Sequence, residues 1–412
     1  MSIPRSRDLR VLAGAAGLSA LGDFMAIFPL ILHVQGRTGS AFAVSALIVA
    51  LWGPVVLAAG TAGAIVDRFE NRRILITVSL GQAIVVAAML LCVDTLWALL
   101  PLMMLLGLGV ALSQPAEFAL VPAAAGPSLD AAQANGFMET ARSIGFTAGP
   151  VVGGALAAAG YLWLALALNA LSFVVVAAAA ALRPARRRPA RVEALARAVR
   201  AGGGFASLVR ERDVAIVLGG AVVSLALFSM SATAEPFFVT GVLGAGNLGY
   251  GVLLTSWTLG MTVGSAGMAH RIGRAWPTVG GVVAILVQGL GIAGGGLAST
   301  LGTALIGFSL GGVAHGVKNV LLRTLIHDRV PETLRGRAFA VYNGARNGAE
   351  LGALLLGAVV VGALGARTAL LVAGVGPAAI ATACLLLLAM RRRAAAAFTT
   401  TEGSVLHAHV QG

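Results

Sequence analysis

Residues 63–73 read GAIVDRFENRR and separate two long apolar runs, residues 41–66 and residues 74–93. Each run has the ~20 residues that a helix needs to cross the hydrocarbon core of a bilayer. Lipid-facing segments do not tolerate an acid followed by three arginines, and an ordinary soluble loop has no need of them. The segment is therefore predicted to be a short reversal of the chain at a membrane surface.

Each residue type in this reversal has a predicted role. Gly63 permits two backbones to approach closely, and Asp67 is placed at a helix end. Arg68, Arg72 and Arg73 are expected to anchor in the lipid headgroups or to pair with carboxylates. The pattern resembles the loop between the second and third helices of the major facilitator superfamily, although a glutamate stands in the spacer where many members have glycine. A generic basic loop on the cytoplasmic side is the alternative interpretation.

The composition places the chain in the membrane. Of its 412 residues 58% are hydrophobic and 11% are charged, and the mean hydropathy is +0.91. The net charge of +13 comes from arginines that are concentrated in alternate loops, which is typical of cytoplasmic loops rather than of a nucleic-acid-binding face. Cys92 and Cys384 lie in apolar runs without metal-ligand or disulfide spacing. We therefore expect an all-α polytopic membrane protein without a bound metal or cofactor.

The apolar runs predict about twelve transmembrane helices in two six-helix bundles. Four parts are expected: an N-terminal bundle (1–182), a basic interfacial linker helix (183–213), a C-terminal bundle (214–393) and a disordered cytoplasmic tail (394–412). A disordered linker is the alternative for 183–213. The predicted spans are 9–33, 41–66, 74–93, 96–121, 135–159, 161–182, 214–240, 247–270, 276–297, 299–325, 337–362 and 366–390.

The arginines also predict the topology. If the N-terminus is cytoplasmic, the outer loops carry only Arg37 and Arg367, and the other loop arginines face inward. Both termini are then cytoplasmic. Two halves of six spans around a long central loop resemble the major facilitator fold, whose substrate site lies near the midplane. Weak internal echoes agree: residues 135–145 resemble 341–348, and residues 267–274 resemble a degraded copy of 63–73.

The fifth predicted span contains a glycine-rich run. Gly145, Gly149 and Gly153 are spaced by four residues, which leaves one helix face free of side chains for close packing. Pro150 removes a helix hydrogen bond and permits a kink. Together with Gly154 the run resembles the Gly-x-x-x-Gly-Pro-x-x-Gly-Gly motif of exporting, proton-antiporting branches of the superfamily. Packing glycines without a transport role are the alternative interpretation.

Several acids are candidates for proton coupling. Asp23 lies near the middle of the first span, where an isolated carboxylate is costly and marks a functional site by default. Such a group can bind and release a proton, although it can also pair with arginine or cap a broken helix. Glu235 is expected to face outer water near the end of the seventh span. Glu139 and Glu350 are further candidates.

Charged residues in spans five and eleven are spaced for helix pairing. Glu139 and Arg142 are three residues apart, and Arg346 and Glu350 are four apart, so each pair lies on one helix face. Together with the reversal at 63–73, and with Glu117 of the fourth span, these pairs are expected either to close an inner gate or to be static pairs that neutralise buried charge.

The substrate cavity is predicted from large apolar and amide side chains. In the tenth span, His315, Lys318 and Arg323 lie in the inner half, and Lys318 is expected to extend to the inner surface unless it attracts an anionic group of a substrate. The predicted cavity residues are Phe24, Phe28, Met230, Phe237, Trp257, Gln288, Asn319 and Tyr342.

Two loops extend the resemblance to one branch of the superfamily. The segment 114–122, QPAEFALVP, and the segment 330–337, VPETLRGR, resemble those of the transmembrane secretion effectors, which include macrolide, multidrug and siderophore exporters. The fourth span, however, has no arginine in its body, where many proton antiporters carry one. The proton route of the family therefore does not transfer to this sequence.

The resulting hypothesis is a monomeric, proton-coupled exporter of amphiphilic small molecules, such as drugs, macrolides or siderophores, in the bacterial cytoplasmic (inner) membrane. Its partners are the substrate, protons and membrane lipids, and nucleic acid is not expected. The sequence contains no catalytic constellation and no phosphate-binding loop, so an enzyme is not predicted. The alternatives are a lysophospholipid or other lipid transporter of the same fold, and a non-transporting scaffold or sensor that uses residues 183–213.

Overall fold

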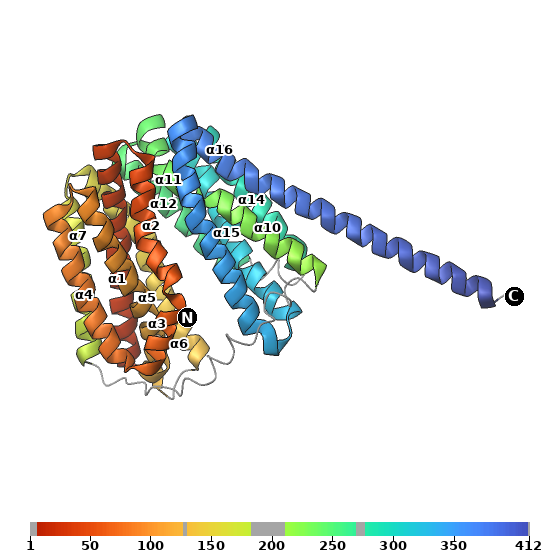
Figure 1. Ribbon diagram of the computed structural model, residues 1–412, viewed down its shortest axis with the longest axis horizontal. Helices are drawn as coiled ribbons and strands as arrows, with labels where there is room; N and C mark the ends of the chain where they lie inside the picture. The colour runs from red at the N-terminus through yellow and green to blue at the C-terminus, as the bar shows by residue number, and fades with distance from the viewer. Residues whose placement is uncertain (1–5, 127–129, 183–210, 269–276, 411–412) are drawn as a thin grey trace.

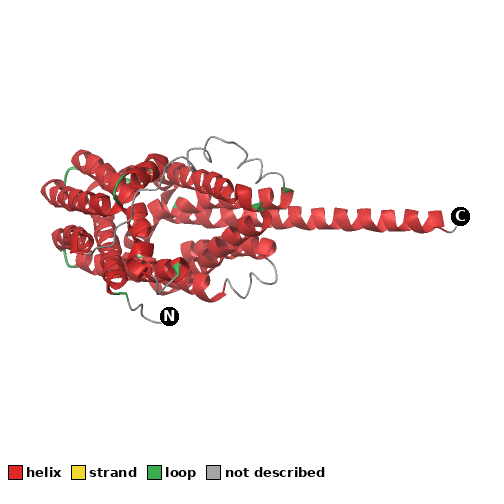
Figure 2. Cartoon of the chain, turned by 90° about the horizontal axis from the view of Figure 1, so that it is seen from below, coloured by secondary structure: helices red, strands yellow, loops and turns green. Residues whose placement is uncertain are grey.

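The structure is a computed structural model of the chain and describes residues 6–126, 130–182, 211–268 and 277–410. These residues are helical almost throughout, and none of them forms a β-strand (Figures 1 and 2). The all-α class expected from the composition is confirmed. Since a helix satisfies its own backbone hydrogen bonds, it is the structure that an apolar chain adopts in lipid.

The N-terminal half contains seven helices in six spans. Ser6 caps the first helix, whose end is set by Gly39 with a φ of 59°. The second span consists of two helices that meet at Ala58 with a bend of 54°, next to Pro54, which cannot donate a backbone hydrogen bond. The helices are α1 (Arg7–Thr38), α2 (Ala41–Leu57), α3 (Ala59–Arg68), α4 (Asn71–Cys92), α5 (Leu96–Ala125), α6 (Ala131–Ala158) and α7 (Leu162–Leu182).

The C-terminal half repeats the six-span plan with more interruptions. Its seventh span ends in a π-helical turn and its eighth contains one, and its last two spans both belong to α16, which is interrupted at Gly365, where φ is 83°. The elements are α10 (Arg212–Ser229), α11 (Ser231–Phe237), η2 (Phe238–Val242), α12 (Gly246–Val263), η3 (Gly264–Met268), α14 (Pro277–Leu297), α15 (Leu301–Arg329) and α16 (Glu332–Val410).

Among the described residues, eight helices are long and apolar enough to cross a membrane, or nine when α2 and α3 count as one bent span. The two segments of α16 on either side of Gly365, together with α6 and α12, complete the twelve predicted spans. Large apolar side chains cover the outside of the molecule; Leu91 is 90% exposed and Trp97 is 83% exposed. A monomeric soluble protein does not expose so much apolar surface, whereas lipid covers it at no cost.

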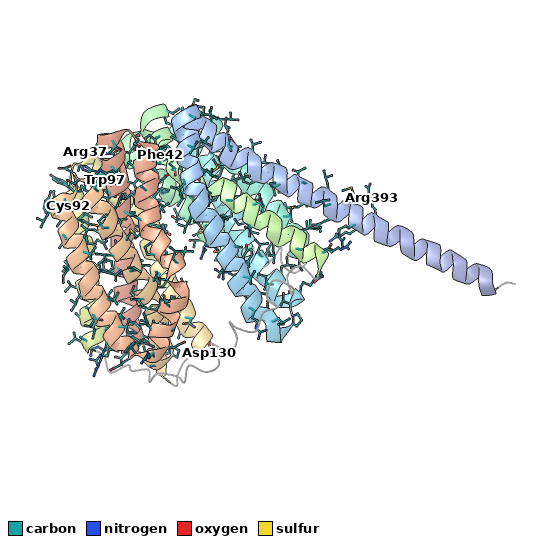
Figure 3. All side chains as sticks on the ribbon, in the orientation of Figure 1. Arg37, Phe42, Cys92, Trp97, Asp130 and Arg393 are labelled. Atoms are coloured by element: carbon teal, nitrogen blue, oxygen red, sulfur yellow. The ribbon has the colours of Figure 1, made fainter. Side chains whose placement is uncertain are left out.

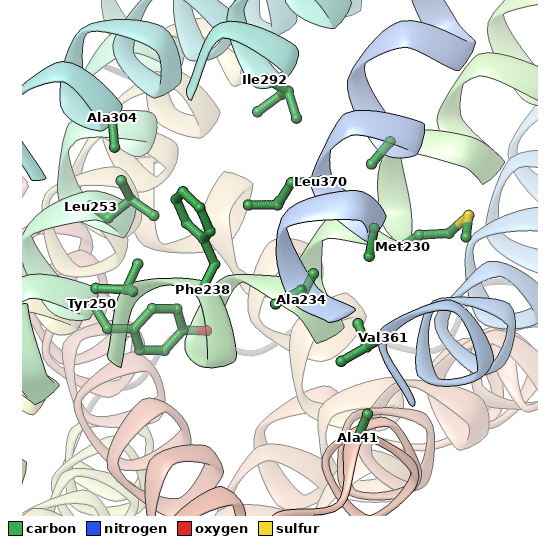
Figure 4. Packing of buried hydrophobic residues seen from close by; sticks show 14 of the residues in the cluster. Ala41, Met230, Ala234, Phe238, Tyr250, Leu253, Ile292, Ala304, Val361 and Leu370 are labelled. Atoms are coloured by element: carbon green, nitrogen blue, oxygen red, sulfur yellow. The ribbon is translucent and has the colours of Figure 1, made fainter. Parts of the chain in front are cut away.

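The two halves contact one another near one end and diverge toward the other (Figure 1). We call the end where α1, α6 and α10 begin the basic end, and the other the opposite end. In Figure 3, Arg37 and Phe42 mark the opposite end and Asp130 the basic end. Between the halves, α2 packs on α16 and α6 packs on α12. Figure 4 shows this closure near the opposite end, where Ala41 of the first half lies beside Val361 of the second.

The C-terminal tail and the central linker are the two segments predicted to lie outside the bundles. The tail 394–412 was expected to be disordered, but α16 continues as a helix to Val410, well beyond the bundle (Figure 1). Four consecutive alanines at 394–397 favour the helix, because alanine has the highest helix propensity. The linker prediction falls on residues 183–213, of which 183–210 lie outside the described residues. The same holds for most of the echo at 267–274.

Candidate functional site

A buried ion pair lies inside the N-terminal half. Arg142 of α6 places an Nη 2.9 Å from an Oε of Glu117 of α5. Both side chains are nearly removed from solvent, and the guanidinium also lies over the rings of Phe118 and Phe146, 6.0 and 5.3 Å from their centroids. The Nε of Arg142 is buried and has no hydrogen-bond partner. The pair therefore joins α5 to α6 within an apolar and aromatic surround.

A second carboxylate lies beside this pair. Asp23 of α1 has Arg142 and Glu117 as its charged neighbours and Asn169 of α7 as a hydrogen-bond neighbour. The contact with α7 is close because residue 22 is glycine: a Cβ there would lie 2.7 Å from the Oδ1 of Asn169. Two acids thus lie near one arginine, which pairs with Glu117. The expectation of an acid near the middle of span one is met by the position of Asp23 in α1.

The pairing of Arg142 differs from the sequence-based prediction. Helix spacing predicted Glu139 as its partner, but Glu139 is exposed, and Arg142 turns to Glu117 of the neighbouring helix. The predicted Glu139–Arg142 pair is therefore wrong in this structure. An interhelical partner is favoured because it neutralises two charges that the apolar surround would otherwise leave unpaired.

The glycine run of α6 makes two different close contacts. A Cβ at Gly145, Gly149 or Gly153 would overlap atoms of α1; at Gly153 it would lie 2.7 Å from the carbonyl oxygen of Met25. A Cβ at Gly154 would instead lie 3.0 Å from the Cα of Gly251, in α12 of the other half. The predicted close packing is therefore present, on α1 and across the two halves. Pro150 lies inside α6, which is continuous from Ala131 to Ala158.

The C-terminal half contains a polar cavity of about 220 Å³. Lys318 of α15 is only 5% exposed, and its ammonium donates to the Oε1 of Gln288 at 2.9 Å and contacts the Nδ1 of His315 at 3.2 Å. The expected extension of Lys318 to the inner surface is therefore wrong. The amide of Gln288 on α14 holds the lysine inside the bundle. Arg323, which is on α15 like the lysine, is exposed.

Two further charges line this cavity. Arg346 and Glu350, one helical turn apart on α16, both line it. The described residues form no ion pair between these two side chains, and the buried Nε of Arg346 has no hydrogen-bond partner. Arg346 and Glu350 therefore lie at the same cavity, as their spacing predicted, but they do not form the predicted ion pair.

Polar contacts close the opposite end between the two halves. Gln35 of α1 donates to the hydroxyl of Thr240 at 2.8 Å, and Ser45 of α2 is 2.8 Å from the hydroxyl of Thr233. Glu235, expected to face outer water, is 7% exposed and accepts a hydrogen bond of 2.8 Å from Ser231. The break between α10 and α11 at Met230 turns this acid inward, so its predicted exposure is wrong.

The reversal at 63–73 connects α3 to α4 at the basic end. The Nε of Arg72 donates to the carbonyl oxygen of Ala180 at 2.8 Å, and an Nη donates to that of Ala181. Arg72 therefore caps the C-terminal end of α7, a partner that was not predicted. Arg73 pairs with Glu70 at 2.9 Å on the exposed surface, as the carboxylate prediction allows.

Gly63, Asp67 and Arg68 of the same reversal make fewer contacts than expected. A Cβ at Gly63 would meet nothing within 4 Å, so the predicted close backbone approach there is wrong. The bend between α2 and α3 directs this glycine away from a neighbouring helix. Arg68 is exposed and lies over the ring of Phe69. In the described part of the chain, neither Asp67 nor Arg68 pairs with the charged residues of α6 or α16.

The sequence pattern of the major facilitator superfamily matches residues 12–353, most of the chain. The chain belongs to the major facilitator superfamily. A comparison with curated protein sequences gave no match.

Solved structures of this superfamily share the fold. The nucleoside transporter NupG has a TM-score of 0.73 at 14% identity, over 93% of this chain and 99% of that one. A bacterial homologue of the human lysosomal transporter Spinster, inward-facing and unoccupied, has a TM-score of 0.69 at 16% identity, over 93% and 97%. The human organic anion transporter MFSD10 has a TM-score of 0.60 at 17% identity, over 94% and 100%. At these identities the likeness concerns the fold alone.

The predicted cavity residues of this superfamily member fall into three groups. Trp257, Asn319 and Tyr342 line the cavity, and Gln288 binds its lysine. Phe24 and Phe28 of α1 form an aromatic cluster with Phe146 of α6 and Tyr250 of α12. Met230 is buried in the core and Phe237 packs against it.

Sequence reasoning did not identify Phe228 as a cavity residue. It stacks on Trp257 with centroids 5.1 Å apart and planes inclined by 16°. One phenylalanine in an apolar span carries no signal that distinguishes a cavity wall from a lipid-facing residue.

Proposed function

We propose that this transporter is a proton-coupled exporter of amphiphilic small molecules. The observation that carries the proposal is that two carboxylates, Asp23 and Glu117, lie near a single cation, Arg142, inside the N-terminal half, and that Arg142 pairs with Glu117. One guanidinium neutralises one carboxylate, and an unneutralised carboxylate in an apolar surround is costly. Taking up a proton removes that cost, so this cluster is suited to exchange a proton during transport.

The state of the molecule fits export. If the arginine-rich basic end faces the cytoplasm, as the positive-inside rule predicts, the halves are closed on the outer side and diverge toward the cytoplasm. This is the state in which an exporter takes up its cargo. The proton can drive the change to the other state only if its affinity differs between the two conformations.

The contacts between halves are compatible with such a change. Backbones approach closely where Gly154 of α6 meets Gly251 of α12, so no side chains interlock there. The polar contacts that the described residues make between the halves, such as Gln35 to Thr240 and Asn247 to the carbonyl of Ala157, join neutral groups. Neutral hydrogen bonds of this kind contribute about 0.5–1.5 kcal/mol each, which a coupled transport cycle can overcome.

Similarity to solved structures does not select the cargo. Three of the neighbours are named as transporters of nucleosides, peptides and organic anions, at identities of 12–17%. The cargo class must therefore be argued from the residues of this chain.

The test is efflux from cells that express the full chain. A panel of fluorescent amphiphilic cations, macrolides and aromatic carboxylates is compared for the wild type, Asp23→Asn and the control Asp328→Asn, which removes an exposed acid at the end of α15. We expect efflux that an uncoupler abolishes, lost in Asp23→Asn at equal expression and retained in Asp328→Asn.

Three results would contradict parts of this proposal. Efflux that persists in Asp23→Asn would remove Asp23 from the coupling step and direct attention to Glu139, Glu235 and Glu350. Efflux that is insensitive to the uncoupler would contradict proton coupling. No efflux of any compound in the panel would contradict export of amphiphiles.

A further inference from the structure

The cavity of the C-terminal half contains a buried cation with an unused hydrogen-bond donor. An ammonium group has three N–H donors. Lys318 contacts Gln288 and His315, which accounts for two of them. Within the described residues no carboxylate forms an ion pair with Lys318. A buried, hydrogen-bonded cation that lacks a direct anionic partner is costly, and such a group in a span marks a site of function.

The neighbouring charges do not neutralise this lysine. Arg346 and Glu350 both line the cavity, so the three side chains together carry one excess positive charge. The Nε of Arg346 is buried without a hydrogen-bond partner. Lys318 and Arg346 thus each have an N–H without a partner, and two cations against one acid give the cavity an electrostatic preference for an anion.

One wall of the cavity is aromatic. The rings of Phe228 and Trp257 are stacked with centroids 5.1 Å apart, and the ring of His315 lies 5.3 Å from Trp257 and 5.7 Å from Phe228. Lys318 and this wall meet at His315, so a ligand that holds its charge at the lysine has the aromatic surface beside it. Flat apolar groups pack well on such a surface.

The volume of the cavity limits the size of the ligand. At about 220 Å³ it is smaller than the roughly 300–1,000 Å³ of sites for drug-sized ligands. A macrolide is too large for it in this state, whereas a compound with one or two rings is of suitable size.

We propose that this cavity binds a small aromatic organic anion, with its carboxylate at Lys318 and Arg346 and its ring against Phe228, Trp257 and His315. The inference rests on the proposed function, because it names the class of cargo. Gln288 has a positioning role: its carbonyl oxygen fixes the position of the ammonium through the 2.9 Å hydrogen bond. Glu350 lowers the positive charge of the empty site and so reduces the cost of burying two cations.

The experiment measures binding to the full chain purified in detergent. The probes are 2-naphthoate, the neutral 2-naphthylmethanol and the cationic 2-naphthylmethylammonium, and the dissociation constant of each is determined by calorimetric titration. We expect 2-naphthoate to bind about tenfold more tightly than the alcohol, because a charged hydrogen bond replaces a neutral one. The ammonium compound should bind most weakly. Equal affinity for the anion and the alcohol would overturn the proposal.

Variants assign the effect to the lysine. Lys318→Gln should reduce 2-naphthoate affinity about tenfold and leave the alcohol unchanged, and Lys318→Arg should restore part of the affinity. Arg329→Gln is the matched control. It also removes a cation from α15, but at the basic end, where Arg329 pairs with Glu211. Unchanged 2-naphthoate binding in Lys318→Gln would overturn the assignment. If that variant does not fold, the comparison of the three probes on the wild type still tests whether the cavity prefers an anion.

This test is independent of transport. Binding in detergent needs no proton gradient and no direction. Uncoupler-sensitive efflux of cations together with equal binding of the anion and the alcohol would leave export standing and overturn the anion site. Selective binding of 2-naphthoate without efflux of any compound would support the anion site and contradict export.

Discussion

The two halves of the molecule use their buried cations in opposite ways. In the N-terminal half, Arg142 is 2.9 Å from Glu117, with Asp23 beside it, so acids are in excess. At the cavity of the C-terminal half, Lys318 and Arg346 outnumber Glu350, and Lys318 contacts Gln288 and His315 and forms no ion pair within the described residues. A paired arginine holds helices together, whereas a cation without an anionic partner keeps capacity for a ligand. Under the proposed function, the proton and the anionic cargo would use different halves of the molecule.

The largest effect should come from breaking the paired cluster. Arg142→Met removes one partner of a buried ion pair and leaves Glu117 without its neutralising charge. We expect the free energy of unfolding to fall by about 3–5 kcal/mol, measured by unfolding of purified protein in mixed micelles. Glu117→Gln combined with Arg142→Met should recover most of this loss. A single variant as stable as the wild type would show that the pair has no structural role.

A smaller loss is expected at the reversal between α3 and α4. Arg72→Gln removes two hydrogen bonds that cap α7, at Ala180 and Ala181, and should cost about 1.5–3 kcal/mol. The control is Arg73→Gln, which breaks an exposed pair with Glu70 worth at most about 1 kcal/mol. The same unfolding measurement distinguishes them. Equal losses in the two variants would contradict the capping role of Arg72.

Gln288 tests whether the C-terminal lysine is positioned by a neutral group. Gln288→Leu removes the acceptor of the 2.9 Å hydrogen bond from Lys318, and the lysine can then turn toward Glu350. We expect 2-naphthoate affinity to fall about fivefold, equivalent to about 1 kcal/mol, with the alcohol unaffected. Titration of both compounds checks this. Equal weakening of both would indicate a general loss of cavity shape.

The smallest effect on stability is expected for the unpaired lysine itself. Lys318→Met removes two hydrogen bonds but also removes a buried charge without a direct anionic partner. These contributions oppose one another, so the unfolding free energy should change by less than about 1 kcal/mol. Comparison with Arg142→Met in the same micelles sharpens the contrast between the halves. A loss as large as that of Arg142→Met would mean that Lys318 is structural and not a ligand group.

Much of the fold could be predicted because a membrane span requires a long apolar run with charges at its ends. The first span was predicted at 9–33 and is found at Arg7–Thr38; the ninth, at 276–297, is found at Pro277–Leu297. The close packing at Gly145 and Gly149 was also predicted, since only a side-chain-free face allows such contact. Interruptions within a span, such as that at Ala58, leave the hydropathy pattern unchanged and were not predicted.

The partners of the charged side chains could not be predicted in the same way. Helix spacing identifies neighbours on one helix, so it proposed Glu139 for Arg142, but the partner lies on α5. Gln288 and Lys318 are 30 residues apart and meet only because α14 packs on α15. Contacts between helices depend on how the helices are rotated and packed, and one sequence carries no direct record of that rotation.

The sequence by itself determined the membrane class, the positions of the spans and the asymmetry of the arginines, because each follows from the cost of placing polar groups in lipid. Only the tertiary structure decided that Asp23 lies beside the Glu117–Arg142 ion pair, that Glu235 is buried and that Lys318 remains inside the bundle. These outcomes depend on which charged groups neighbouring helices bring within a few ångströms of one another, and that distance sets the strength of their interaction.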